Sequence, residues 1–447
     1  MTQLSIAAFL ALATASLGLR LTAMSDESAA ASSRQGTPQS SARGGAKVAC
    51  DPDNGGIKLP TGFCAAIVAD GLGYARHMAV ASNGDLYVAL RNRQKQKGAI
   101  VALRDTDGDG KADVRERFGD DGGTGIALRN GFLYFTRGDT SVVRYRMKPG
   151  ELLPDPAAEL IAELPVQQGH AGKGIAFDGK GGLYVNVGAP SNACQSDDRK
   201  AQSPGQDPCP LLERHGGIWR FDDNKPGQKQ MEQGKRYGTG LRQMLAIAWS
   251  PSANALFVVQ HGRDQLDTLW PGMFTAEQNA ELPSEEFLRI EAGSDHGWPY
   301  CYHDWQQGKR VLMPEYGGDG KKTERCEKYP APVVAFPGHW APNSLTFYEG
   351  KQFPSRYRGG AFIAFHGSWN RAPLPQAGYN VAFVPYAAGK FAGKYEVFAD
   401  GFMGSKPPAK PEEALYRPSA TAEGPDGSLY ISDSAKGRIW RVIFRGT

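Results

Sequence analysis

The chain has 447 residues, of which 56 are glycine and 30 are proline, and its formal net charge is +4. This number of turn-forming residues argues against a mainly helical protein and fits two or three ordinary domains or one large β architecture. The charge is small for the length and no basic stripe is present, so we expect no nucleic-acid partner.

Residues 1–23 have the pattern of a signal peptide. Residues 4–18 form an apolar run that is too short for a comfortable membrane span. The positive segment before this run is weak, so an uncleaved membrane anchor is the alternative. No later stretch could cross a bilayer, and we expect no stable membrane insertion. Residues 24–49 are predicted to be a flexible linker, which leaves residues 50–447 as the folded body.

The six cysteines suit an exported chain with disulfides, because oxidising compartments preserve such bonds. They fall into three local pairs. Six cysteines allow fifteen pairings, so pairing between neighbours is a hypothesis. The pairs are Cys50 with Cys64, Cys194 with Cys209, and Cys301 with Cys326.

One sequence pattern typical of a β-hairpin recurs along the body, first as HMAVASNGDLYVAL at 77–90 and last as SATAEGPDGSLYISD at 419–433. Each of six copies is a strand, a polar Gly/Asn/Asp turn and a second strand. The second strands begin 47, 50, 73, 105 and 68 residues apart, and one blade of four strands takes about 40–50 residues. The repeat predicts an all-β, six-bladed β-propeller with insertions in the later blades. Unrelated hairpins in a β-sandwich are the alternative.

Residues 105–116, DTDGDGKADVRE, have the spacing of an EF-hand calcium loop, yet strands flank them. The loop should cap an outer hairpin of the first blade. So many acidic side chains would repel one another without a cation, and a bound ion would stabilise the blade. The predicted calcium ligands are Asp105, Asp107, Asp109, Lys111, Asp113 and Glu116.

Candidate chemistry is scattered over segments that should meet at one end of the propeller. His170 precedes the third hairpin and is suited to general-base work, although a structural turn histidine is the alternative. Arg242 and Arg417 lead into the fourth and sixth hairpins, where they could grip carboxylates or form salt bridges between blades. His261 to Asp264 and the run HGSWNR at 366–371 follow inner strands. Cations gathered with a histidine indicate a multiply anionic ligand.

The chain resembles the glucose/sorbosone dehydrogenase family, whose members are quinoproteins that use pyrroloquinoline quinone (PQQ). The resemblance covers roughly 60–446 and rests on GHAGKGIAFDGKGGLYVNVG, GLRQMLAIAWSP, SDHGWPYC, HGSWNR and RPSATAEGPDGSLYISD. It implies a six-bladed propeller that oxidises an aldose or sugar aldehyde, and it is similar above all to the sorbosone and pyranose dehydrogenases.

The resemblance also implies roles for single residues. His170 stands at the position of the catalytic base, and Arg242 at that of an arginine beside the cofactor. Gly262 and Arg263 fall where carbonyls bind a calcium ion next to the quinone, although the second position is often Pro in the family. The implied cofactor contacts are Arg242, Gln243 (often Asn in the family), His366 (a lysine in well-known members) and Arg417.

Two other classes compete with the dehydrogenase. A calcium-dependent propeller lactonase would need carboxylate and amide ligands on one axial ion, whereas the candidates here are histidines and arginines. A sugar-binding or scaffold propeller without cofactor is favoured by the departures at Gln243, Arg263 and His366. For the dehydrogenase we expect a periplasmic or secreted protein that passes electrons to an external cytochrome or quinone.

Overall fold

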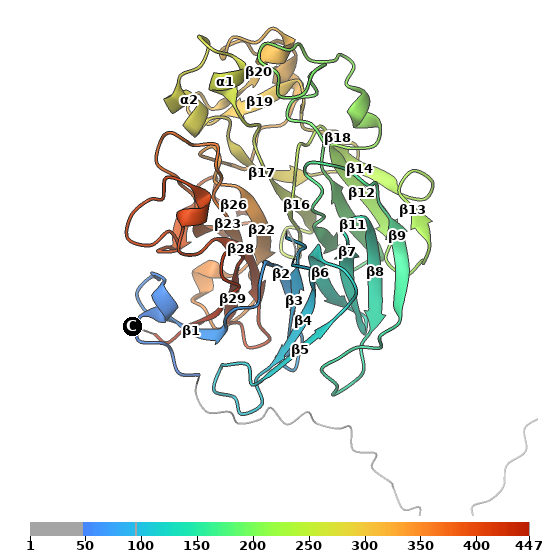
Figure 1. Cartoon of the computed structure of the whole chain (residues 1–447), viewed down its shortest axis with the longest axis vertical. Helices are drawn as coiled ribbons and strands as arrows, with labels where there is room; N and C mark the ends of the chain where they lie inside the picture. The colour runs from blue at the N-terminus through green and yellow to red at the C-terminus, as the bar shows by residue number, and fades with distance from the viewer. Residues whose placement is uncertain (1–47, 94–95, 447) are drawn as a thin grey trace, which may run out of the picture. The chain divides into compact units, whose positions relative to one another are not determined.

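The computed structural model describes residues 48–93 and 96–446. The predicted signal peptide and almost all of the predicted linker lie outside these residues. The described part is built from six sheets of four or five strands, which confirms the predicted six-bladed propeller. Figure 1 shows the sheets arranged around a centre, with β2, β6, β22 and β28 near the middle and β1, β5 and β9 at the periphery.

The first three blades follow one another along the chain, each beginning with its innermost strand. Blade 1 contains β2 (Ala75–Val80), β3 (Leu86–Leu90), β4 (Ala99–Arg104) and β5 (Val114–Phe118). Blade 2 contains β6 (Gly123–Arg129), β7 (Phe132–Arg137), β8 (Ser141–Arg146) and β9 (Ala158–Glu163), with β13 (Gln228–Lys229) added beside β9. Blade 3 contains β10 (Ile175–Phe177), β11 (Gly182–Val187), β12 (Gly217–Asp222) and β14 (Lys235–Thr239), extended by β18 (Ser294–Asp295).

The last three blades carry the longer insertions. Blade 4 contains β15 (Ala246–Ser250), β16 (Ala255–Gln260), β17 (Glu285–Ile290) and β21 (Val334–Phe336). Blade 5 contains β22 (Pro342–Phe347), β23 (Ala361–Phe365), β24 (Asn380–Val384) and β27 (Glu396–Ala399). Blade 6 contains β28 (Pro418–Glu423), β29 (Leu429–Asp433), β30 (Ile439–Phe444) and, as its outermost strand, β1 (Phe63–Ala69) from the other end of the body.

Contacts between innermost strands close the ring. β2 contacts β6, β6 contacts β10, and the series continues through β15, β22 and β28 back to β2. β1 completes the sixth blade by pairing antiparallel with β30, so that Phe63 lies opposite Phe444. A pairing between strands so far apart in sequence ties the two ends of the body together.

Apolar side chains fill the spaces between neighbouring blades. Tyr87 and Ile100 of blade 1 pack in one buried cluster with Leu133 and Phe135 of blade 2. Similar clusters lie between the blades of each remaining neighbouring pair. This follows from the sequence, since a sheet buried on both faces reads as a nearly continuous apolar run, as in the AIVAL of β4.

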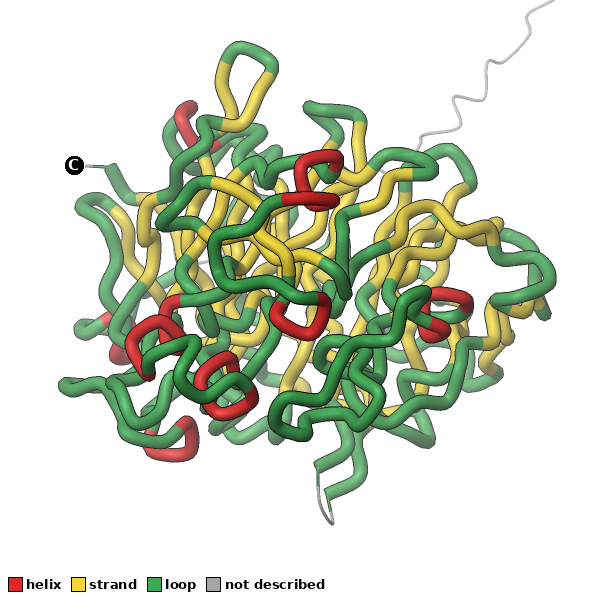
Figure 2. The backbone as a smooth tube through the Cα atoms, turned by 90° about the horizontal axis from the view of Figure 1, so that it is seen from above, coloured by secondary structure: helices red, strands yellow, loops and turns green. Residues whose placement is uncertain are grey.

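The insertions form small elements outside the blades. Helices α1 (Leu266–Leu269) and α2 (Ala276–Glu281) and the hairpin of β19 (Cys301–Asp304) and β20 (Lys309–Leu312) gather at one edge of the sheet ring in Figure 1. A second hairpin joins β25 (Tyr386–Ala387) to β26 (Lys390–Phe391). Short 3-10 helices span Asn54–Gly56, Pro210–Glu213, Pro314–Tyr316, Glu324–Lys328, Ser355–Tyr357 and Pro411–Glu413. Many loops and short helices lie toward the lower edge of Figure 2.

Three disulfides join the local pairs that the sequence suggests: Cys50–Cys64, Cys194–Cys209 and Cys301–Cys326. The second and third share one buried cluster with Trp298 and Tyr300, which stabilises the insertions. The pairing indicates a protein that folds in an oxidising compartment. None of the helices in the described ranges has the length and hydropathy that a bilayer span requires.

Candidate active site

The predicted site residues belong to one end of the propeller, which we call the axial mouth. The first two strands of each blade are antiparallel, so the start of the first and the end of the second lie at the same edge. His170, Arg242 and Arg417 come shortly before the innermost strands β10, β15 and β28. His261 and His366 directly follow the second strands β16 and β23. The mouth is defined by these five residues.

His170 and His261 are half-buried and lie close to the positive charge of Arg242. Burial, reinforced by this charge, lowers the pKa of His170 to about 3 and that of His261 to about 4. Both imidazoles are therefore neutral at physiological pH. The Nδ1 of His170 donates to the Ala189 carbonyl, which leaves the lone pair on Nε2. That is the form in which a histidine accepts a proton.

His366 and Arg417 form the opposite part of the mouth. Arg417 donates to the carbonyl of His366 at 3.2 Å and to that of Gly367 at 2.7 Å. The Nε2 of His366 lies 2.7 Å from the Ser434 hydroxyl. Burial and the charge of Arg417 lower the pKa of His366 well below its usual value. The structure therefore joins these two predicted residues by direct contact.

Arg242 already has a full set of protein partners. Its guanidinium donates to Asp264 at 2.8 Å, to the Asn192 side chain at 3.0 Å and to the Gly262 carbonyl at 2.7 Å. Arg199 donates to the same Asp264 carboxylate at 2.8 Å. Although burial acts in the opposite direction, Arg242 helps to lower the pKa of Asp264 well below its usual range. Arg242 thus contributes a fixed, neutralised charge to the mouth.

Gln243 is also engaged within the protein. Its side-chain nitrogen lies 3.3 Å from the Gly172 carbonyl, and its oxygen accepts from Asn186 at 3.2 Å. Its backbone carbonyl accepts from the His261 N–H at 2.9 Å. These bonds connect blade 4 to the loop that carries His170. The cofactor contact predicted for Gln243 stays a prediction.

Gly262 and Arg263, predicted near a calcium ion, have other partners here. The Arg242 guanidinium lies 2.7 Å from the Gly262 carbonyl oxygen, so a calcium ion on that oxygen would have to displace it. The Arg263 side chain turns to Glu315 and donates to both carboxylate oxygens at 2.6 Å, with both side chains fully buried. As they stand, these contacts do not fit an axial calcium ion, which stays a prediction.

Arg76 lies beside these five residues, although the sequence motifs do not point to it. It lies on β2, is 2% exposed, and its field contributes to lowering the pKa values of His261 and His366. Among the described residues its Nε has no hydrogen-bond partner. The available signal was an arginine inside an otherwise apolar inner strand, ARHMAV.

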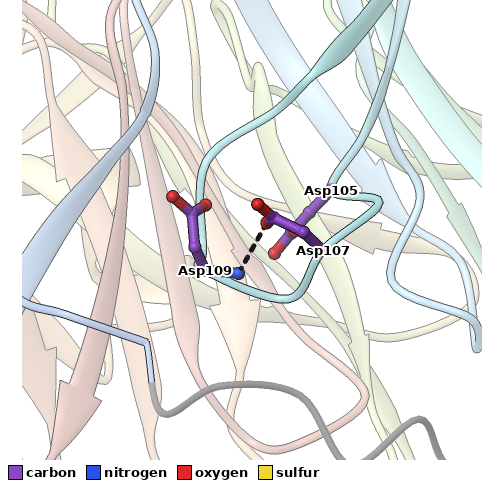
Figure 3. Close-up of side chains that lie close together, drawn as sticks. All are labelled: Asp105, Asp107 and Asp109. Atoms are coloured by element: carbon purple, nitrogen blue, oxygen red, sulfur yellow. Dashed lines mark hydrogen bonds between the residues drawn. The ribbon is translucent and has the colours of Figure 1, made fainter.

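The acidic loop lies where the sequence places it, between β4 and β5 of blade 1. Oxygens of Asp105, Asp107 and Asp109 lie within 4.8 Å of one another, and Figure 3 shows the three side chains on one loop. The loop is shaped by bonds from backbone N–H groups, such as Gly110 to Asp105 at 2.8 Å. Gly110 has φ +97°, a conformation that favours glycine at this sharp bend.

The other predicted ligands lie outside this group of three. The Asp113 carboxylate accepts twice from Thr106, at 2.7 Å each, and these bonds lower its pKa. The Lys111 N–H donates to Asp109 at 2.7 Å. Glu116 lies on β5 and is exposed. The described loop therefore offers three converging carboxylates, while the full ligand set stays a prediction.

The fold is that of propellers related to PQQ-dependent sugar oxidoreductases. The model of the TrAA12-like family matches residues 57–444, and the chain belongs to this family. This confirms the relationship that the sequence motifs indicate.

Solved structures of the same fold cover most of the chain. A Trichoderma reesei enzyme of carbohydrate-active family AA12 has a TM-score of 0.71 at 18% identity, over 87% of this chain and 98% of that one. The PQQ domain of Coprinopsis cinerea pyranose dehydrogenase, in its holo form, has a TM-score of 0.69 at 18% identity, over 87% and 97%. The soluble aldose sugar dehydrogenase of Escherichia coli has a TM-score of 0.55 at 15% identity, over 86% and 100%.

Curated relatives align over shorter segments. An uncharacterised Borreliella burgdorferi protein is 27% identical over 208 residues, which are 46% of this chain and 48% of that protein. The PQQ-dependent pyranose dehydrogenase of Coprinopsis cinerea is 26% identical over 168 residues, 34% of this chain and 22% of the relative. The aligned segments thus span about half of the first relative and about a fifth of the second.

Proposed function

We propose that this protein oxidises an aldose or a sugar aldehyde, of the pyranose or sorbosone type, at C1 by hydride transfer to PQQ. One observation carries the proposal: a neutral, half-buried histidine, His170, shares the axial mouth with Arg76, Arg242 and Arg417. PQQ carries three carboxylates, so a mouth rich in guanidinium groups suits it. The buried Nε of Arg76, without a partner among the described residues, is a donor that such an anion would satisfy.

In this proposal His170 is the general base. Its Nε2 takes the proton of the C1 hydroxyl (of the hydrate, where the substrate is an aldehyde) while the bond to Ala189 holds the ring in the required tautomer. A bound PQQ would supply the hydride acceptor. Help from a general base contributes about 10²–10⁴ in rate. Burial, with a smaller contribution from Arg242, keeps the imidazole neutral, and Arg242 orders Asp264 and Asn192 around the mouth.

The cofactor would be held mainly by the other half of the mouth. Arg417 is fixed by the carbonyls of His366 and Gly367, so its guanidinium is oriented before a carboxylate arrives. His366 is fixed in turn by Ser434. Gln243 would help by supporting the His170 loop through Gly172.

Calcium enters the proposal in two places. The three converging carboxylates between β4 and β5 would bind the ion and stabilise blade 1. A second ion beside the cofactor would take the carbonyls of Gly262 and Arg263 only after Arg242 moves away, so no step depends on it. A calcium structure of the Trichoderma reesei family member is a reason to test both proposed calcium sites.

The proposed place of action is the periplasm or the cell exterior. The three disulfides support an oxidising compartment. Electrons would leave to an external cytochrome or quinone, because the sequence contains no CxxCH haem-attachment motif.

The proposal is tested by adding PQQ and calcium to the purified protein and measuring quinone absorbance and aldose-dependent dye reduction. Dye reduction that needs both PQQ and sugar supports a dehydrogenase. A quinone spectrum without turnover on any aldose would contradict the activity and leave a cofactor-binding propeller. Absence of both would contradict the cofactor as well. Arg441→Gln serves as the control variant: it removes an ion pair with Asp426 away from the mouth and should reduce the dye as wild type does.

A further inference from the structure

Arg76 differs from the other buried arginines of the described chain. Six arginines of the described chain are buried, and five of them form an ion pair with a carboxylate. Arg76 is the sixth: it is 2% exposed and no described carboxylate lies within ion-pair distance of it. The five pairs are Arg144 with Glu159, Arg242 with Asp264, Arg263 with Glu315, Arg310 with Glu286 and Arg371 with Glu281.

The surroundings of Arg76 add positive charge. Its guanidinium carbon lies 5.7 Å from the centre of the Tyr74 ring, and that of Arg93 lies 5.0 Å from the same centre. Although burial acts in the opposite direction, Arg76 and Arg417, together with Arg91 and Arg93, lower the pKa of Tyr74. Among these cations Arg91 is held by Asp139, at 3.4 Å. The cluster thus has more cations than the described carboxylates neutralise.

A buried charge without a partner is costly, and protein interiors normally satisfy each one. Such a residue is expected where a ligand supplies the missing counter-charge. Arg242, the arginine expected from the sequence to grip the cofactor, has its own carboxylate in Asp264. Arg417 bonds to two carbonyl groups, which leave its charge unneutralised.

We infer that Arg76, together with Arg417 and Tyr74, forms the subsite that binds a carboxylate of the anionic cofactor, while Arg242 stays paired with Asp264. This inference rests on the proposed function for the identity of the anion. It assigns the buried strand residue Arg76 as a binding residue whose charge destabilises the empty protein. Ligand binding by Arg76 and its destabilising effect in the empty protein are linked, because both result from the missing counter-charge.

The test uses the full-length protein and the substitution Arg76→Met, which keeps the volume and removes the charge. Without ligand, its Tm should rise by several degrees, while its Kd for PQQ, measured by fluorescence quenching, should increase about 10- to 100-fold. Arg144→Met is the matched control, since Arg144 is buried but bonded to Glu159 and Tyr134. It should lower the Tm and leave the Kd unchanged. A fall in Tm for Arg76→Met with an unchanged Kd would overturn the inference.

Two further measurements keep the inference testable. If Arg76→Met does not fold, Arg76→Lys is measured in its place. A Kd for PQQ that is higher than that of wild type but still measurable then supports the subsite. If wild type does not bind PQQ, citrate is used as a tricarboxylate probe in the Tm assay. Citrate that stabilises wild type but not Arg76→Met supports the anion subsite and contradicts only PQQ as its ligand. Equal shifts in both proteins would overturn the subsite itself.

Discussion

The Lys173 ammonium donates to the side-chain oxygen of Gln167 at 3.2 Å and to the Ala171 carbonyl at 2.6 Å. The Gln167 amide nitrogen donates in turn to the His170 carbonyl at 3.2 Å. His170 has φ 43°, a left-handed conformation that residues other than glycine seldom adopt. Lys173 is fully buried, and it therefore holds the loop that carries the proposed base from inside the protein.

Lys173→Met should change how stability depends on pH. Burial lowers the pKa of Lys173 to about 8, against 10.5 for an ordinary lysine. Between these values the unfolded chain binds a proton that the folded chain has lost, so the free energy of unfolding rises with pH. Wild type should therefore gain up to about 3 kcal/mol relative to the variant across this window. Urea unfolding of both proteins at several pH values measures this gain. A difference that is constant with pH would contradict it.

His170→Ala should lower turnover by about 10²–10⁴ because the general base is lost. Binding of PQQ should persist, since the arginines remain in place. Steady-state dye reduction and quinone titration measure the two effects separately. Because burial and Arg242 lower the pKa of His170 to about 3, the neutral base should be present at all pH values above about 4 and be lost only as pH falls further. Normal turnover in the variant would remove His170 from the mechanism.

Glu315→Gln should destabilise the protein by about 3–5 kcal/mol, because it leaves Arg263 buried without its counter-charge. Chemical unfolding measures the change in free energy. Combining the substitution with Arg263→Met should recover part of the loss, since the double variant buries no unpaired charge. A double variant less stable than Glu315→Gln alone would show that the pair is not the source of the effect.

Replacing Cys301 and Cys326 together by Ala should cost about 3–4 kcal/mol, the chain-entropy value for a loop of this length. The separation of the two cysteines is 25 residues, and the loop they close includes the β19–β20 hairpin. Thermal unfolding with and without reductant checks the prediction. Fully reduced wild type should be at least as destabilised as the variant, because reduction also breaks the two other disulfides.

Calcium should raise the Tm of wild type, and Asp107→Asn and Asp109→Asn should weaken this response because each removes a charge from the converging group. At a free concentration one hundred times the Kd, the ion should contribute about 2.7 kcal/mol. Differential scanning calorimetry with calcium or with a chelator measures it. Asp120→Asn, at an exposed residue just after β5, is the control and should leave the response unchanged. An equal response in all variants would mean that the ion binds elsewhere.

The fold was predictable because each blade repeats a local signal, an apolar strand, a Gly/Asn/Asp turn and a second apolar strand. The six second strands lie where the repeat predicts them, as β3 at Leu86–Leu90 and β29 at Leu429–Asp433 illustrate. Closure by β1 was not predicted. The pairing of Phe63 with Phe444 depends on tertiary structure and has no neighbouring signature in the sequence.

The site was predictable in position but not in partners. His170, Arg242 and Arg417 reach one mouth because each precedes an inner strand. Their hydrogen bonds could not be inferred, since Arg263 finds its acid 52 residues away at Glu315. Arg76 was missed for a related reason. Its interest lies in having no partner among the described residues, and a missing contact leaves no pattern in the sequence.

The pairing of β1 with β30 also determines when the molecule can be completed. The ribosome makes β1 first among the strands and β30 last. All strands of the first five blades precede β28, whereas the sixth blade lacks its third strand, and β1 its partner, until β30 has been made. A chain cut just before β30 would therefore leave β1 unpaired and reduce the sixth blade to β28 and β29.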